Sequence, residues 1–192
     1  MKRILTLIIF AISVPFFAHA QKYYELGLGL SDVIGNFPET GSRLSVSLGI
    51  GYDYAFKGDW SVDSKVLCAM NGKSKYGALF LSIPVTANYH IDRFELGIGP
   101  YVSCNIVDIN HNPDKYYDWN PEVEYKPYLT TYSGYFTRLD FGACCRVRYG
   151  ISTRHIGLEA YMGALNCGKK YDGEMPINGH TVIINVTYGV KF

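Results

Sequence analysis

The sequence is poor in charge and, after its first 20 residues, has no apolar run long enough for a membrane helix. Only 18% of its 192 residues are charged, and the formal net charge is +1. A chain without a basic patch cannot neutralise phosphates, which argues against nucleic acid as a partner. Its five cysteines show neither a CxxC motif nor a Cys/His spacing typical of zinc. We therefore expect no metal and no cofactor.

The cysteines are also odd in number, at positions 68, 104, 144, 145 and 167. Cys144 and Cys145 are adjacent, so on a strand they would face opposite sides. We interpret most of the cysteines as small apolar wall residues. A disulfide between two of them stays an open alternative.

Residues 1–20 have the pattern of a secretory signal peptide. Lys2 and Arg3 provide the positive start, residues 4–17 the apolar segment, and residues 18–20 (Ala-His-Ala) a small-x-small cleavage site. The apolar run is too short for a transmembrane anchor. The pattern predicts a mature chain of residues 21–192, one domain in length, exported through the periplasm.

The mature chain alternates apolar and polar residues, and its last twelve residues show this most clearly. Every second residue there is apolar or aromatic: Val182, Ile184, Val186, Tyr188, Val190 and Phe192. The residues between them are mostly polar or small. Since successive side chains on a strand point to opposite faces, this segment predicts a strand with one apolar and one polar face.

Seven further segments repeat this alternation, which gives eight predicted strands, an even number as in single-chain outer-membrane barrels. Pro84 lies in the fourth and predicts a bulge or a local break, because proline donates no ladder hydrogen bond. The predicted strands are 24–30, 44–56, 60–70, 78–89, 94–106, 136–149, 155–165 and 181–192.

Two features support this count. Short connections at 57–59, 91–93 and 150–154 alternate with longer ones, as short periplasmic turns alternate with outer loops in membrane barrels. The outward aromatic residues gather beside the short turns and the termini, which predicts a girdle at the periplasmic rim. These residues are Tyr24, Tyr52, Tyr54, Phe56, Trp60, Tyr89, Phe94, Tyr149, Tyr188 and Phe192.

A soluble lipocalin-like barrel is the structural alternative, with its apolar set inside. The second set of residues is rich in glycine and carries six acids and five bases, which suits a small lumen where charges pair. We therefore predict an all-β fold, an eight-stranded antiparallel up-and-down transmembrane β-barrel with a salt-bridged, plugged lumen rather than an ion pathway. The predicted lumen charges are Glu25, Asp53, Asp63, Lys65, Glu95, Arg138, Asp140, Arg146, Arg148, Glu159 and Lys191.

Four segments resemble the PorT-like outer-membrane β-barrel domain family of Bacteroides-type bacteria. They are residues 81–89 (LSIPVTANY), 94–102 (FELGIGPYV), 139–142 (LDFG) and 188–192 (YGVKF). The resemblance covers essentially the whole mature chain. It implies location in the cell outer membrane, contact with its lipid and lipopolysaccharide, and insertion by the barrel-assembly machinery. One family member serves a protein-secretion system, which implies an accessory role there as an alternative.

An enzyme that modifies lipid is another alternative, since some eight-stranded barrels act on lipid A. Such catalysis needs a serine and a histidine close together near the outer leaflet, with an acid that orients the histidine. His90 and His155 lie near short turns, on the wrong side for such a substrate, and His180 has only Thr181 beside it. We therefore expect no catalytic residue.

The long segment between strands five and six is the best candidate for binding, because aromatic rings with a polar group favour recognition surfaces. Packing over the barrel mouth or in a headgroup belt is the equal alternative. We expect a structural or surface-interaction role with an extracellular or secretion-system partner that the sequence does not identify. The candidate binding residues are Tyr116, Tyr117, Trp119, Tyr125 and Tyr128.

Overall fold

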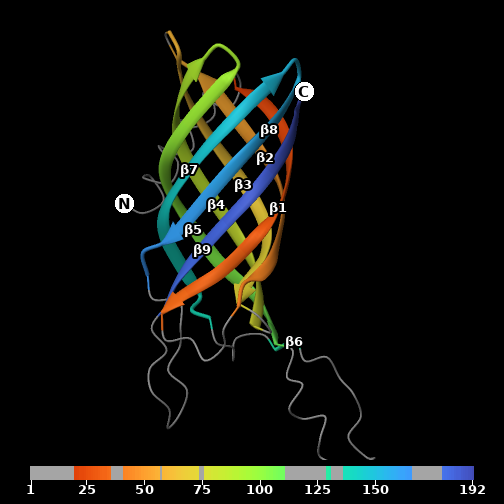
Figure 1. Ribbon diagram of the computed structural model, residues 1–192, viewed down its shortest axis with the longest axis vertical. Coiled ribbons are helices and arrows are strands. Elements are labelled where there is room, and N and C mark those ends of the chain that lie inside the picture. Colours follow the sequence, from red (N-terminus) through yellow and green to blue (C-terminus); the bar gives the residue numbers. More distant parts are fainter. Residues whose placement is uncertain are drawn as a thin grey trace, which may run out of the picture.

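The computed structural model describes residues 20–35, 41–56, 58–73, 76–110, 129–130, 136–165 and 179–192. These ranges form strands, shown in Figure 1. No helix within them is long and apolar enough to cross a membrane. The strands are β1 (Gln21–Gly35), β2 (Arg43–Ala55), β3 (Trp60–Lys73), β4 (Tyr76–Ile91), β5 (Phe94–Asn110), β6 (Leu129–Thr130), β7 (Leu139–Ile151), β8 (Arg154–Gly163) and β9 (Gly179–Lys191).

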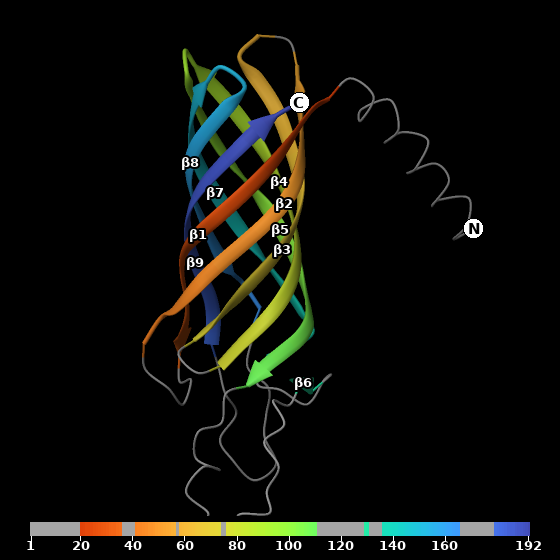
Figure 2. The same ribbon diagram turned by 90° about the vertical axis from the view of Figure 1, so that its right-hand side faces the viewer.

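Eight of these strands close into one antiparallel barrel, which confirms the predicted fold class. Neighbours along the chain pair with each other, β5 pairs with β7, and β1 pairs with β9 from Tyr23↔Lys191 to Gly35↔Gly179. The two-residue strand β6 pairs only with the end of β5. Figures 1 and 2 show a tall barrel of tilted strands, with the carboxyl terminus and the short turns at one end. We call this end the turn mouth and the opposite end the loop mouth.

The barrel is apolar outside and polar inside, as the alternation predicts. On β1, Leu26 and Leu28 are 44% and 50% exposed, whereas Glu25, between Tyr24 and Leu26, is 2% exposed. The same division repeats on the other strands, with Ile98 and Leu158 outside and Arg146 inside. An exterior of this kind is stable in hydrocarbon and not in water, and closure leaves no unpaired strand edge in the lipid. The barrel is therefore built to span a membrane.

The predicted aromatic girdle is present at the turn mouth, and its members contact one another in pairs. Tyr24 stacks on Phe192 with ring centroids 4.6 Å apart, and Trp60 meets Tyr89 at 5.0 Å. The pairs Phe94–Tyr149 and Tyr54–Phe56 are similarly close, at 5.0 and 5.2 Å. Amphipathic rings favour the headgroup level of a bilayer, so this belt marks one membrane boundary.

The proline on β4 interrupts the sheet locally without shifting its register. The β3–β4 pairing is lost between Ser64↔Val85 and Leu67↔Ser82, opposite Pro84. The bulge lies elsewhere, between Leu79 and Phe80 on the β4–β5 side. The predicted local break is thus confirmed, and its cause is the missing proline N–H.

Candidate functional site

Arg148 on β7 lies at the centre of a buried ion network in the half of the lumen near the turn mouth. Its Nη2 lies 2.7 Å from Glu25 Oε2, and its Nη1 lies 3.2 Å from Asp63 Oδ2. The guanidinium carbon lies 4.8 Å from the ring centroid of Tyr23, whose hydroxyl donates to Asp63 at 2.6 Å. Because these side chains are almost fully buried, each charge needs a partner to offset its loss of hydration.

Arg146 faces the same interior, because it lies two residues before Arg148 on the same strand. Its Nη1 donates to Asp63 Oδ1 at 2.7 Å, and its Nη2 pairs with Glu95 Oε1 at 2.9 Å. Arg148 Nη1 also reaches Glu95 Oε1, at 3.4 Å. Two planar guanidinium groups thus hold the carboxylates of β3 and β5 together across the lumen.

Lys65 on β3 extends the network toward β8. Its ammonium pairs with Glu25 and, at 2.5 Å, with Glu159. Glu159 also accepts a hydrogen bond from the Tyr161 hydroxyl at 2.6 Å. Lys65 is 1% exposed, so it is held away from water by these partners.

The charges of this network almost balance. Four carboxylates (Glu25, Asp63, Glu95 and Glu159) face three cations (Lys65, Arg146 and Arg148). A fourth base joins them, since His155 Nε2 lies 3.1 Å from Glu25 Oε2. The network is therefore neutral when His155 is protonated and carries one negative charge when it is not.

The His155 ring needs a glycine beneath it. His155 on β8 pairs in register with Gly189 on β9, and a Cβ at Gly189 would overlap the imidazole. The absence of a side chain at position 189 lets the ring lie flat against the barrel wall. The ring then meets Tyr23 edge to face, with centroids 5.3 Å apart.

An apolar layer covers the network on the side of the loop mouth. It consists of Leu67, Tyr101, Cys144 and Tyr161, and the two tyrosine rings meet edge to face at 5.5 Å. Beyond it lies a small cavity lined by both polar and apolar side chains, where Tyr101 donates to Asp140 Oδ2 at 2.9 Å. The space open to a water molecule there is about 20 Å³, which suits a single ordered water.

The lumen is also filled near the loop mouth. Phe136 is 1% exposed and meets Phe80 edge to face at 6.0 Å. Lys73 Nζ donates to the Val33 carbonyl at 2.6 Å and pairs with Asp32 at 2.9 Å. The lumen is thus occupied by side chains along its length, as expected for eight strands.

The structure brings most of the predicted lumen charges into this network, with exceptions. Asp53 and Lys191 form a separate pair at the turn mouth, 3.8 Å apart, and Asp140 lies beyond the apolar layer. Arg138 is exposed just before β7, so it lies outside the buried network. The predicted strand began at Phe136 and placed Arg138 on the inner face, but β7 begins only at Leu139.

The five candidate binding residues, Tyr116, Tyr117, Trp119, Tyr125 and Tyr128, lie outside the described part of the chain. Among the described cysteines, 68, 104, 144 and 145, all are free thiols. Cys144 is buried and Cys145 is exposed, so these neighbours face opposite sides as expected.

The sequence prediction missed several lumen residues. Tyr23 lay one residue before the predicted first strand, and His155 was omitted because the predicted lumen set counted only acids, lysines and arginines. His90 lay just outside the predicted strand, which stopped at Tyr89. Continuing the inward phase of Asn88 by two residues would have found it.

A serine–histidine contact does exist, although not where an outer-leaflet enzyme would need it. Ser61 Oγ lies 2.9 Å from His90 Nε2 at the turn mouth, and Asn88 donates to the same oxygen at 3.2 Å. Ser61 is only 1% exposed and points into the lumen, away from lipid. A buried hydroxyl that already has two partners is poorly placed to attack a lipid ester.

Comparison with known proteins supports the fold. No family model matches the chain, and no curated protein matches it in sequence. The chain is similar in structure to Neisserial surface protein A, with a TM-score of 0.51 and 14% identity over 91% of this chain and 97% of that one. A weaker similarity is to Ail, the attachment invasion locus protein of Yersinia pestis, with a TM-score of 0.47 and 11% identity over 91% of this chain and 99% of that one. Another is to the outer membrane enzyme PagL, with a TM-score of 0.43 and 9% identity over 88% of this chain and 98% of that one. The chain thus has the fold of the eight-stranded outer-membrane β-barrels.

Proposed function

We propose that the protein is a non-enzymatic outer-membrane barrel with a closed lumen, whose outer loops are available for surface interaction. The observation that carries this proposal is the buried ion network under the apolar layer of Leu67, Tyr101, Cys144 and Tyr161. A lumen filled in this way stabilises the wall and leaves no continuous aqueous path. Function then depends on what projects from the barrel rather than on what passes through it.

Conductance in planar bilayers tests whether the lumen is closed. The refolded protein should insert without producing stable current steps at moderate voltage. A porin inserted in the same bilayer serves as the positive control. Reproducible unitary steps from the wild-type protein would show an ion pathway and refute the closed lumen.

The aromatic residues of the long loop provide the proposed binding surface. Replacing Tyr116, Tyr117 and Trp119 together by Ser should reduce attachment of barrel-bearing cells to host-cell monolayers and leave the folded band on an unboiled gel unchanged. A fall in the denaturation midpoint with unchanged attachment would instead support the packing alternative, in which these rings stabilise the barrel mouth.

A lipid-modifying enzyme remains the second proposal, and it is tested directly by mass spectrometry of lipid A. Cells with the wild-type barrel should have the same lipid A acyl pattern as cells without it. Loss of an acyl chain that depends on Ser61 or His90 would establish an enzyme and overturn the non-enzymatic role.

The PorT-like resemblance and insertion by the barrel-assembly machinery are further parts of the proposal. An accessory role in a protein-secretion system is its alternative. The signal peptide is another part of the proposal, since residues 1–19 lie outside the described ranges. Amino-terminal sequencing of membrane-extracted protein should begin at Gln21. Retention of Met1 in the mature protein would refute the cleavage.

A further inference from the structure

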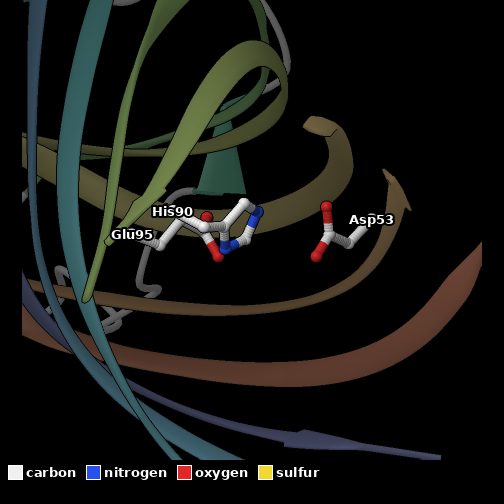
Figure 3. Close-up of side chains that lie close together, drawn as sticks. All are labelled: Asp53, His90 and Glu95. Atoms are coloured by element: carbon white, nitrogen blue, oxygen red, sulfur yellow. The ribbon is translucent and has the colours of Figure 1, made fainter. Parts of the chain in front are cut away.

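Three side chains with metal-binding atoms converge at the turn mouth, apart from the network around Arg148. Asp53 comes from β2, His90 from β4 and Glu95 from β5, and one donor atom of each lies within 4.8 Å of the others. Figure 3 shows the Asp53 carboxylate facing the His90 ring, with Glu95 on the other side of the ring. We propose that this cluster is a binding site for a divalent transition metal ion of the zinc type.

The sheet register creates this cluster from residues that are far apart in sequence. His90 and Glu95 are register partners across the tight β4–β5 turn, so both point into the lumen at the same level. Asp53 reaches them across the mouth from β2. A set made of one imidazole and two carboxylates fits zinc, which accepts both nitrogen and oxygen ligands and keeps a fourth position open.

Asp53 supplies an independent sign of a cation site. The residue is 8% exposed, yet its Oδ1 is buried with no hydrogen-bond partner among the described residues. Its register partner on β3 is another buried acid, Asp63, and like charges opposite each other destabilise a sheet. Asp63 is neutralised by Arg146 and Arg148. Asp53 accepts a hydrogen bond from Ser61, but within the described ranges its one cationic partner is Lys191, at 3.8 Å.

The other two proposed ligands, His90 and Glu95, each have a donor atom that can coordinate an ion. Ser61 Oγ lies 2.9 Å from His90 Nε2, so the hydroxyl can accept the ring N–H and leave the second nitrogen for the metal. Arg146 and Arg148 both bond Oε1 of Glu95, which leaves Oε2 for coordination. Ser61 and the two arginines do not touch the ion but would orient its ligands, as the hydrogen-bond partners of the ligands do in many zinc sites.

The geometry requires a small contraction. Donor atoms on one tetrahedral zinc are about 3.4 Å apart, given metal–ligand bonds of about 2.1 Å. The donor atoms lie within 4.8 Å of one another, so ion binding would need them to approach by rotation of the Asp53 and Glu95 side chains. Lys191, whose side chain is 24% exposed, lies at the mouth and can swing outward as the ion enters.

Zinc titration of the refolded, untagged protein in detergent tests the site. Isothermal calorimetry should show one zinc ion per barrel, with much weaker binding of magnesium, which prefers all-oxygen ligands. Asp53→Asn and His90→Gln should each weaken zinc binding at least about tenfold, since losing only a hydrogen-bond partner of a metal ligand already costs that much affinity. Lys191→Met should tighten it, because the competing ammonium is gone.

His180→Gln is the matched control, because His180 is an exposed histidine at the opposite end of β9. It should leave zinc affinity unchanged. The unboiled gel band reports whether each variant folds, and the isosteric Asp53→Asn variant carries the test if His90→Gln does not fold. Zinc should also raise the denaturation midpoint of the wild type and not that of Asp53→Asn.

Three results would overturn the proposal. One is the absence of zinc binding to the wild type up to millimolar concentration. Another is equal zinc affinity in the wild type and the folded His90→Gln or Asp53→Asn variants. The third is magnesium binding as tight as zinc binding, which would indicate only a negatively charged mouth.

Discussion

Replacing Lys65 by Met removes the ammonium that joins Glu25 and Glu159, and the barrel should lose a large part of its stability. Both acids are no more than 3% exposed, so water cannot replace the lost partner. Breaking a buried pair from one side costs about 3–5 kcal/mol. Arg148 stays within 2.7 Å of Glu25 and 3.3 Å of Glu159 and offsets part of the loss, so we expect about 3 kcal/mol.

The net charge of the network predicts a partial rescue. In Lys65→Met, four carboxylates face two arginines. Adding Glu159→Gln leaves three carboxylates facing two arginines. This restores the wild-type excess of one negative charge when His155 is neutral. The double variant should therefore be more stable than Lys65→Met alone by about 1–2 kcal/mol, within the range of coupling between contacting residues.

Guanidinium unfolding in lipid vesicles, followed by Trp fluorescence and by the unboiled gel band, measures both changes. Lys22→Met is the matched control, because Lys22 is exposed at the turn mouth and should change stability by less than about 0.5 kcal/mol. A loss below about 1 kcal/mol in Lys65→Met, or a double variant no more stable than the single one, would refute the reasoning about this network.

Two further predictions concern the lipid face and the lumen wall. Leu48→Arg, in the middle of β2 and 61% exposed, should cost about 2–4 kcal/mol, whereas Leu44→Arg near the loop mouth should cost about 0–1 kcal/mol. Equal unfolding free energies for these two variants would contradict the position of Leu48 deeper in the membrane than Leu44. Gly189→Ala should cost about 1–3 kcal/mol because the new methyl group overlaps His155, while Gly150→Ala, whose nearest neighbour would be 3.6 Å away, should cost little. Equal denaturation midpoints for these two would show that the His155 ring lies elsewhere.

The alternation of residues predicted all eight barrel strands because lipid imposes one uniform rule on the outer face. The bounds were less accurate where the strands leave the membrane. β1 was expected to end at Leu30 but continues to Gly35, and it places Val33 inside the barrel. Beyond the lipid neither face must be apolar, so alternation no longer reports the strand. The same reason explains the extension of β5 to Asn110.

The lumen was only partly predictable. The face that points into the lumen was predicted correctly for the acids and bases on strands with clear alternation, such as β3 and β8. The expectation of polar inner residues failed for Leu67, an apolar side chain on the inner face of β3 that packs with Tyr101 and Tyr161. Which charges pair depends on the closure of the barrel, since Glu25 and Arg148 are 123 residues apart in the chain. A single sequence read strand by strand contains no signal for that distance.

The seam between β1 and β9 has a consequence for the order of assembly. It joins residues between 144 positions apart (Gly35 with Gly179) and 168 positions apart (Tyr23 with Lys191). One edge of β1 therefore stays without a hydrogen-bonding partner until β9 has folded against it. Contacts of such long sequence separation slow folding and prolong exposure to aggregation. A template that pairs with the edge of β1 during this interval would protect it from aggregation until β9 replaces the template.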